Sequence, residues 1–287
     1  MSGQAGALRC YLCGSSDVQF VQANPSYSYV ACRACGFRRR HPLPSAEEER
    51  ELYEDEYYED RGLVIGLDGQ SSLLLELITD RVTKLTELNG GPGSLLDIGA
   101  GTGLFMEAAM RAGWRATGLE TSEAAARIAG RITKGRILQG RVEDLDFEGR
   151  FDAATLWDVL EHLPDPRATL GVIRSRLKTR GLVGISLPNV SGLKARLRGD
   201  RWRYYQHSFG HISHFSPRTL STLLEQAGFK PEVVSATGLF NVGRLFGLDA
   251  VAVHQDHRVL RWAQARADGA AGVVGMGESI VAFARAS

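Results

Sequence analysis

The sequence predicts an α/β fold built around a doubly wound, mostly parallel sheet. From about residue 72 onward, short apolar patterns typical of strands alternate with patterns typical of helices. A glycine-rich loop follows the first of these strands and opens a helix. The 287 residues, 44% of them hydrophobic, suffice for one sizeable core with a small appendage. Ligands bind such sheets at the carboxyl ends of the strands.

The appendage is expected at the N-terminus, where the four cysteines of the chain form two Cys-x-x-Cys pairs, each followed by glycine. Such a turn points both sulfurs at one centre, so two of them predict a closed, structural zinc site. Short strands predicted at 18–21 and 27–30 complete the pattern of a zinc ribbon, which we place at residues 1–44. A redox dithiol and unpaired thiols are the alternatives to zinc at Cys10, Cys13, Cys32 and Cys35.

Residues 45–72 are expected to form a linker and an N-terminal cap helix. Carboxylates crowd this stretch, which is typical of a solvated helix. Tyr53, Tyr57 and Tyr58 are spaced so that aromatic rings share one helical face, and part of the segment is therefore expected to pack.

The remaining residues, 73–287, are expected to form the cofactor domain. Its helices are predicted at 73–88, 104–112, 123–130, 166–177 and 216–228. Its strands are predicted at 94–98, 116–120, 137–139, 151–156, 181–186, 233–235 and 280–283. A long insertion at 238–277, helical around 259–266, is expected to cover the active site or an oligomer interface.

The loop at 99–103 is the most informative segment. Glycines at 99, 101 and 103 allow a tight turn and a close approach of the backbone to a ligand. Dinucleotide folds space their glycines G-x-G-x-x-G, whereas the third glycine here arrives one residue earlier. Asp97 precedes the loop, and Glu120 ends the next strand, where its carboxylate could accept both ribose hydroxyls. The chain has no phosphate loop of the G-x-x-x-x-G-K-S/T type, which is consistent with a cofactor that lacks phosphate.

With these motifs the chain resembles the class I S-adenosylmethionine-dependent methyltransferases over roughly residues 50–285. The segment 95–103, Leu-Leu-Asp-Ile-Gly-Ala-Gly-Thr-Gly, matches the first motif of that family, and 151–166 resembles its fourth strand and the loop after it. The resemblance implies a seven-stranded sheet closed by an antiparallel pair, with S-adenosylmethionine as the cofactor. Because Arg141 stands where many relatives have aspartate, the adenine contacts are expected from Val142 and Glu143. The full set of implied cofactor contacts is Asp97, Gly99, Ala100, Gly101, Gly103, Glu120, Thr121, Val142, Glu143, Trp157, Asp158 and His162.

Residues 190–216 are expected to form a lid over the acceptor. The basic run at 194–203 is either a solvated face or a clamp for a phosphate or carboxylate of the substrate. The Trp-x-Tyr-Tyr pattern and the His-x-x-His pattern after it resemble a segment that lies over the acceptor pocket of small-molecule methyltransferases. Acceptor contacts are accordingly expected from Tyr57, Arg201, Trp202, Tyr204 and His211.

Histidine is the natural base near neutral pH for removing a proton from the acceptor. The candidate catalytic residues are His162, His211 and His214, with His207 as a weaker candidate. His211 and His214 have the spacing to share one helical face. Structural hydrogen bonding or the ordering of a loop is the alternative role for each of them.

Charge and length narrow the class of partner. A net charge of +1, and no stretch near the roughly 20 apolar residues of a membrane span, favour a cytoplasmic protein that binds neither membranes nor nucleic acid. We expect O- or N-methylation of a small-molecule acceptor, which can be anionic or tethered to a carrier. The alternatives are C-methylation of a nucleotide-linked keto-sugar and RNA methylation, the latter indicated only by the basic runs 38–41 and 194–203. As a non-enzymatic alternative, the N-terminal ribbon would be a docking module that brings the domain to a carrier protein or another partner. The sequence does not indicate the oligomeric state.

Overall fold

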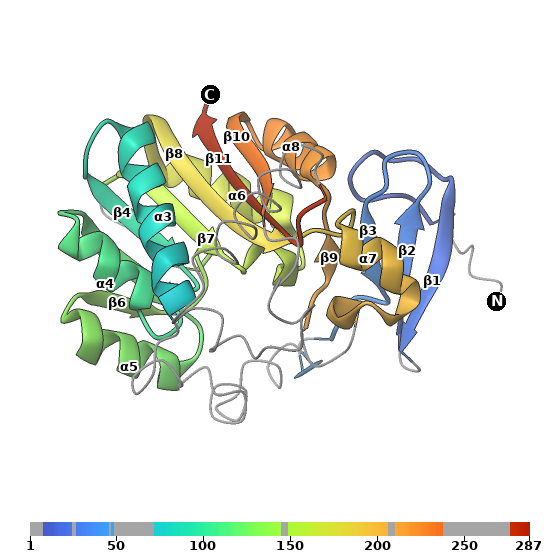
Figure 1. Cartoon of the computed structure of the whole chain (residues 1–287), viewed down its shortest axis with the longest axis horizontal. Coiled ribbons are helices and arrows are strands. Elements are labelled where there is room, and N and C mark those ends of the chain that lie inside the picture. The colour runs from blue at the N-terminus through green and yellow to red at the C-terminus, as the bar shows by residue number, and fades with distance from the viewer. Residues whose placement is uncertain are drawn as a thin grey trace, which may run out of the picture.

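The structure is a computed structural model that describes residues 8–24, 27–45, 47–48, 72–144, 149–205, 210–237 and 276–287. Tyr57 and the cap helix expected around it lie outside the described residues, as do His207 and nearly all of the insertion expected at 238–277. The ribbon diagram in Figure 1 shows a central sheet with helices around it and a smaller sheet next to it.

The central sheet has seven strands among the described residues, which confirms the predicted fold class. These strands are β4 (Ser94–Ile98), β5 (Arg115–Glu120), β6 (Arg136–Gln139), β7 (Phe151–Trp157), β8 (Leu177–Pro188), β10 (Phe229–Thr237) and β11 (Ser279–Ala286). They lie in the order β10-β11-β8-β7-β4-β5-β6. Only β11 runs antiparallel to its neighbours, β8 and β10, and every other pair is parallel. The carboxyl ends of β4, β5 and β7 therefore meet at one edge of the sheet.

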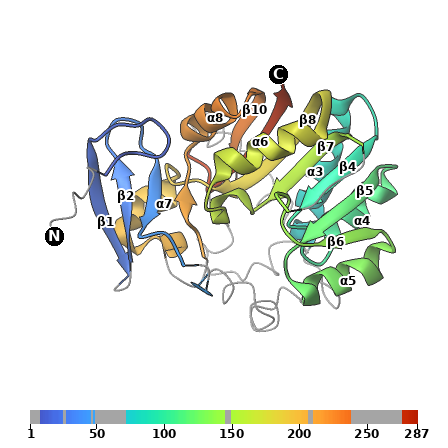
Figure 2. The same ribbon diagram turned by 180° about the vertical axis from the view of Figure 1, so that it is seen from behind.

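Helices cover both faces of this sheet. They are α3 (Ser72–Asn89), α4 (Leu104–Arg111), α5 (Glu123–Thr133), α6 (Pro166–Arg176) and α8 (Pro217–Gln226). Neighbouring strand residues point to opposite faces, so Leu95 packs with α3 and α4 while Leu96 packs with α6 and α8. Figure 2, which views the molecule from behind, shows α6 and α8 on the face opposite to α3. None of the described helices combines the length and the apolar character that a membrane span requires.

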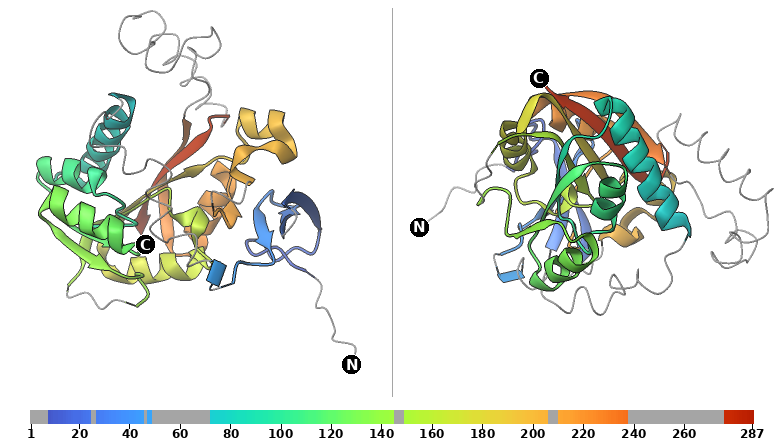
Figure 3. Two further views of the ribbon diagram at one scale, coloured as in Figure 1. Left: turned by 90° about the horizontal axis from the view of Figure 1, so that it is seen from below. Right: turned by 90° about the vertical axis from the view of Figure 1, so that its left-hand side faces the viewer.

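The smaller sheet contains more than the two strands that the sequence predicted. It runs β1 (Val18–Asn24), β2 (Tyr27–Cys32), β3 (Arg38–His41) and β9 (Ser213–His214). The basic run after the last cysteine is thus a strand, with Arg38 paired to His214 of the lid. Because the backbone at β9 is extended, the helical face suggested for His211 and His214 does not form. Figure 1 shows β9 beside β3, and Figure 3 shows the N-terminal strands, in blue, from two further sides.

The N-terminal module also shares its hydrophobic core with the larger domain. Phe37 is 1% exposed, and its ring centroid lies 5.1 Å from that of Phe215. The buried residues Cys10, Leu12, Cys32 and Phe37 belong to the same core cluster as β7, β8, α6 and α8. Polar contacts reinforce this packing, since the Tyr11 hydroxyl donates to Asp165 at 2.5 Å and Gln226 Nε2 donates to the Leu12 carbonyl at 3.0 Å. The ribbon and the domain are therefore expected to unfold together.

This shared core gives a stability prediction. Replacing Phe37 with Ala removes a fully buried ring and leaves a cavity, which is expected to lower the free energy of unfolding by about 3 kcal/mol or more. Urea unfolding followed by both tryptophan fluorescence and circular dichroism would measure the change. Coincident transitions at a lower urea concentration are expected for Phe37→Ala. A separate early transition that leaves the domain at its wild-type midpoint would show instead that the ribbon has its own core.

Candidate functional site

The glycine loop lies at the carboxyl end of β4, and its glycines serve different purposes. All three have positive φ angles, at 68° for Gly99, 54° for Gly101 and 84° for Gly103. A Cβ at Gly99 would lie 2.4 Å from a methyl of Val159, and a Cβ at Gly103 would lie 2.9 Å from a methyl of Thr133, so close packing excludes a side chain at both. A Cβ at Gly101 would meet no atom within 4 Å. Gly101 therefore faces open space, where a ligand can approach the backbone.

Glu120 at the end of β5 is fixed against this loop. Its side chain is 3% exposed, and one carboxylate oxygen accepts a hydrogen bond from the Gly101 amide at 2.8 Å. The other oxygen accepts from the Ser122 amide at 2.9 Å and from the Thr121 hydroxyl at 3.4 Å. These bonds hold the carboxylate beside the open side of the loop.

Asp97, the fourth residue of β4, lies deeper in the sheet. It is 2% exposed and accepts a hydrogen bond of 2.7 Å from the Thr155 hydroxyl on β7. Burial raises the pKa of Asp97 to about 7, while the bond from Thr155 acts in the opposite direction and the nearby Glu120 adds to the rise. The protonation state of this carboxyl is therefore sensitive to a nearby cation.

Arg81 on α3 is a candidate site residue that the sequence analysis missed. Its guanidinium lies over the Trp157 ring at 4.7 Å from the centroid and 3.8 Å from the Asp158 carboxylate. Arg81 Nε and Trp157 Nε1 are both buried and have no hydrogen-bond acceptor among the described residues. Buried donors of this kind could donate to an acceptor on a ligand. Helical spacing could have revealed Arg81, since it lies on the same face as the buried Ile78 and Leu85.

The residues expected around adenine follow β6. Val142 is buried and belongs to the same core cluster as Ile98 and Leu119. The Glu143 carboxylate accepts a hydrogen bond from the Thr169 hydroxyl on α6, which ties this loop to the helix. The contacts of Val142 and Glu143 with adenine stay a prediction.

The four cysteines converge as their spacing predicted. The sulfurs of Cys10 and Cys35 are 3.6 Å apart, as are those of Cys13 and Cys32, and all four lie within 4.8 Å of one another. A tetrahedral zinc ion with bonds of about 2.3 Å would place its sulfur ligands roughly 3.8 Å apart. The geometry of the donor set therefore fits one structural zinc ion.

Two of the candidate catalytic histidines lie together. His162 ends the short helix η1 (Leu160–His162) that follows β7, and its ring centroid is 4.7 Å from that of His211 in the lid. Glu161, next to them, is 1% exposed, and its Oε1 is 3.9 Å from His211 Nε2. Val159 packs on Gly99 of the glycine loop. The cluster starts two residues later in the chain, at Glu161. The sequence analysis singled out His162 and His211 but missed Glu161.

The third candidate, His214, lies in a different environment. It is 1% exposed and packs between the rings of Tyr29 and Tyr205, at centroid distances of 4.6 and 4.8 Å. Burial first, and then the charges of Arg38 and His162, hold the pKa of His214 well below its usual range. A neutral ring packed in this way suits a structural role.

The lid residues that were expected to contact the acceptor also differ from one another in their surroundings. Trp202, between η2 (Gly199–Arg201) and η3 (Arg203–Tyr205), is buried against Tyr205 and His214. Tyr204 instead stacks on His211, with the rings 5.2 Å apart and inclined by 10°. Arg201 is exposed at the end of η2. Trp202 also meets Tyr204 edge to face, with the ring centroids 5.0 Å apart, so the structure brings Trp202, Tyr204 and His211 together and leaves Arg201 apart from them.

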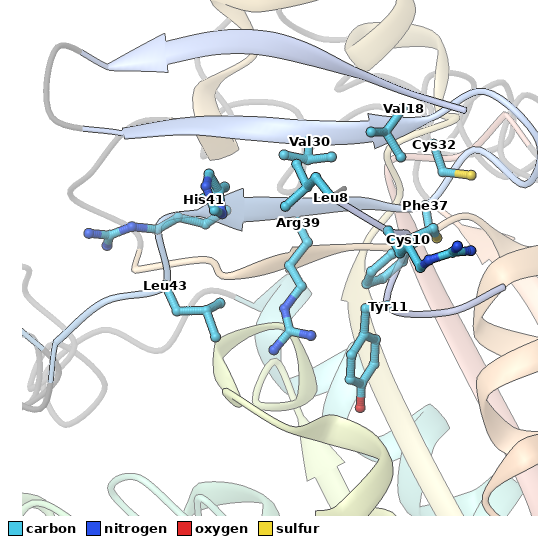
Figure 4. Close-up of a pocket in the computed structure, with 12 residues that line it drawn as sticks. Leu8, Cys10, Tyr11, Val18, Val30, Cys32, Phe37, Arg39, His41 and Leu43 are labelled. Atoms are coloured by element: carbon cyan, nitrogen blue, oxygen red, sulfur yellow. The ribbon is translucent and has the colours of Figure 1, made fainter. Parts of the chain in front are cut away.

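A pocket lies on the ribbon side of the molecule, away from the glycine loop. Its lining includes Tyr11, Val30, Phe37 and Arg39 and no residue of the loop. Figure 4 shows Tyr11 and Arg39 extending side by side from the ribbon, with the guanidinium 4.1 Å from the centre of the ring. Arg39 donates to the Pro164 carbonyl, so this pocket belongs to the joint between ribbon and domain.

The strand order and the position of the glycine loop agree with the class I methyltransferase fold expected from the sequence. A family model described as a methyltransferase domain matches residues 71–235, which is more than half of the chain. The chain therefore belongs to this methyltransferase family, and it is an S-adenosylmethionine-dependent methyltransferase.

Curated relatives match part of the chain. The ubiquinone biosynthesis O-methyltransferase of Chromobacterium violaceum is 27% identical over 167 residues, which cover 54% of this chain and 72% of the relative. The protein of the same name from Xanthomonas campestris pv. campestris strain B100 is 36% identical over 106 residues, which cover 34% of this chain and 44% of the relative. The chain thus spans less than half the length of the Xanthomonas relative.

Solved structures with the same fold match over more of the chain. The 1,6-didemethyltoxoflavin-N1-methyltransferase of Burkholderia thailandensis, solved with S-adenosylhomocysteine, is 18% identical with a TM-score of 0.56, covering 94% of this chain and 99% of that one. The cyclase SpnF is 22% identical with a TM-score of 0.57, covering 85% and 98%. At these identities the likeness concerns the fold alone, and a cyclase among such structures shows that this fold hosts more than one reaction.

Arg81 gives a first prediction for cofactor binding. If its guanidinium binds the carboxylate of the methionine part, Arg81→Ala is expected to weaken S-adenosylhomocysteine binding by roughly 10- to 100-fold, the loss typical of a charge-assisted pair. Calorimetry would measure the affinity. Lys84→Ala is the matched control, since Lys84 lies on the same helix and pairs with Glu87 at 3.2 Å. Equal affinities for the wild type and Arg81→Ala would rule out this role.

Asp97 gives a prediction on pH. Its pKa of about 7 means that the carboxyl is mostly ionised at pH 8 and mostly protonated at pH 6. A ligand ammonium pairs with the ionised form, so binding must expel the proton at low pH. The affinity for S-adenosylhomocysteine is expected to fall by about tenfold between pH 8 and pH 6. Calorimetry of Asp97→Asn should give a weaker affinity without this pH dependence, and a flat wild-type profile would contradict the prediction.

Proposed function

We propose that the chain transfers a methyl group from S-adenosylmethionine to an oxygen or nitrogen of a small-molecule acceptor that binds under the lid. The observation that carries this proposal is the cluster of Glu161, His162 and His211 beside the glycine loop. It offers groups that can remove a proton from the acceptor within a largely buried site.

The residues at the carboxyl edge fit S-adenosylmethionine group by group. Arg81 would hold its carboxylate, Asp97 its ammonium group and Glu120 its ribose hydroxyls, with Val142 and Glu143 at the adenine. When bound, S-adenosylmethionine supplies an electrophilic methyl group, and the electrons of the broken S–C bond stay on sulfur. The protein's own task is then placement of the acceptor and removal of its proton.

His211 and His162 are the candidates for that base. His211 stacks on Tyr204 and faces Glu161, so the lid fixes its ring and the carboxylate can stabilise its protonated form. His214 is not assigned this role, because aromatic rings enclose it and its pKa is held low.

The relatives support a small acceptor that is methylated on oxygen, since the curated ones are named as O-methyltransferases of ubiquinone biosynthesis. An RNA acceptor is less well supported. Arg38 donates to the Tyr205 hydroxyl, Arg39 donates to the Pro164 carbonyl and Arg40 pairs with Glu48 at 2.7 Å, so this basic run is used within the molecule. No observation favours a keto-sugar acceptor over the others.

We also propose that Cys10, Cys13, Cys32 and Cys35 bind structural zinc, and that the zinc ribbon of residues 1–44 orients the lid. The support is the sulfur geometry and three contacts between ribbon and lid. The Tyr29 hydroxyl donates to the His211 carbonyl at 2.7 Å, the Arg40 amide donates to the Ile212 carbonyl at 2.8 Å, and the Tyr27 hydroxyl donates to the Tyr205 carbonyl at 3.2 Å. Zinc would thus fix the acceptor side as well as the ribbon.

A screen of phenols, catechols and amines with S-adenosylmethionine, read out as S-adenosylhomocysteine formed, tests the function. With an acceptor in hand, His211→Asn is expected to lower kcat by about 100-fold or more, since the variant lacks a base. Affinity for S-adenosylhomocysteine should be unchanged. His41→Asn is the matched control, because His41 is an exposed histidine on β3. Full activity of His211→Asn would remove this residue from the mechanism.

A further inference from the structure

The cluster of Glu161, His162 and His211 has a second property that proton transfer does not require. One ligand atom from each of the three side chains can be chosen so that all lie within 4.8 Å of one another. Glu161 and His162 are consecutive in η1, whereas His211 comes from the lid, so the fold brings together residues that are distant in sequence. Two imidazoles and one carboxylate are ligands typical of zinc and of other divalent transition metals.

The Glu161 carboxyl group is buried in a way that would suit a metal ligand. It is 1% exposed, and neither oxygen has a hydrogen-bond partner among the residues that the structure describes. Burying an ionised carboxylate without hydrogen bonds is costly, so such groups are normally paired or coordinate a metal. The His211 ring, at 3.9 Å, is too distant for a hydrogen bond but suitably placed for a shared ligand.

The contacts that hold the two histidine rings in place are also of the kind found at metal sites. His162 Nδ1 is 3.2 Å from the Gly210 carbonyl, which can only accept, so Nδ1 carries the proton and Nε2 keeps its lone pair. Histidines that bind metals usually donate their other ring nitrogen to such a carbonyl. His211 is held by the stacked Tyr204 ring, and the Tyr29 hydroxyl binds its carbonyl.

Three protein ligands leave a position open, as in catalytic rather than structural zinc sites. With bonds of about 2.0 to 2.1 Å, tetrahedral zinc places its ligand atoms roughly 3.4 Å apart. The observed separations, 3.9 Å for one pair and at most 4.8 Å for the others, require a contraction that side-chain rotation can supply. His162 is partly exposed, which gives an ion access from solvent.

We propose that Glu161, His162 and His211 bind one divalent transition-metal ion of the zinc class, at a site distinct from the four cysteines. The use of this ion rests on the proposed function: its open position would take an acceptor hydroxyl and lower the pKa of that hydroxyl. The site therefore selects acceptors that present an ionisable oxygen, such as a phenol or an enol, over amines.

Cobalt binding to the full chain tests the proposal without any acceptor. The metal-free protein is titrated with Co²⁺, and bound metal is counted by mass spectrometry of the desalted protein. A four-cysteine site gives intense thiolate-to-cobalt charge transfer in the near ultraviolet, whereas a site of two histidines and a carboxylate gives only weak visible bands. The wild type is expected to bind two cobalt ions per chain. Glu161→Gln and His162→Asn are each expected to bind one and to keep the thiolate band.

Matched controls separate loss of the site from loss of the fold. His41→Asn should bind two ions, and every folded variant should keep the circular dichroism spectrum of the wild type. One cobalt ion per wild-type chain, with the thiolate band alone, would overturn the proposal, as would two ions in both Glu161→Gln and His162→Asn. A second ion without methylation of any oxygen or nitrogen acceptor would refute the proposed function and leave the metal site standing. Methylation by a wild-type chain that binds only one cobalt ion would refute the metal site and leave the proposed function standing.

Discussion

The conformation of the segment around His211 and His214 depends on the pairing of strand β3 with strand β9. In this pairing Arg38 lies opposite His214, and the Arg40 amide donates to the Ile212 carbonyl at 2.8 Å. A strand of two residues has too few ladder bonds to persist alone. It forms here because β3 is already held in the ribbon sheet, whose turns converge on four cysteine sulfurs within 4.8 Å of one another. The lid thus takes its conformation from a segment far away in sequence.

The methyltransferase domain holds the same lid from the other side. The Ile212 amide donates to the Glu161 carbonyl at 2.8 Å, and the Val190 amide donates to the Phe215 carbonyl at 2.9 Å. Ile212, the neighbour of His211 in the chain, therefore accepts a hydrogen bond from the ribbon and donates one to η1. Any shift of the ribbon relative to the domain would move His211 against Glu161. The N-terminal sheet therefore helps to set the position of His211 relative to Glu161.

Sequence patterns predicted the features that depend on short segments of chain. The seven strands, the glycine loop and the two Cys-x-x-Cys turns each have a local signature, and the structure has them at those positions. The pairing of β3 with β9 has no such signature, because a strand of two residues is too short to show an alternation of apolar and polar side chains. Arg81 was missed because its significance lies in Trp157 and Asp158, which are distant in sequence. Glu161 was missed although it precedes His162, because only its burial without hydrogen bonds distinguishes it from a surface glutamate.

The aromatic layer under the lid explains why neighbouring histidines can have different roles. Tyr29, Trp202 and Tyr205 surround His214 and exclude water from it, so carrying a charge there would be costly. Glu161 lies instead with His211 and His162, and burial raises the pKa of its carboxyl well above the usual range. A proton on His211 or a metal ion shared by the three side chains would stabilise the ionised form of this carboxyl. The different surroundings therefore suit His162 and His211 to the proposed chemistry, and they suit His214 to a structural role.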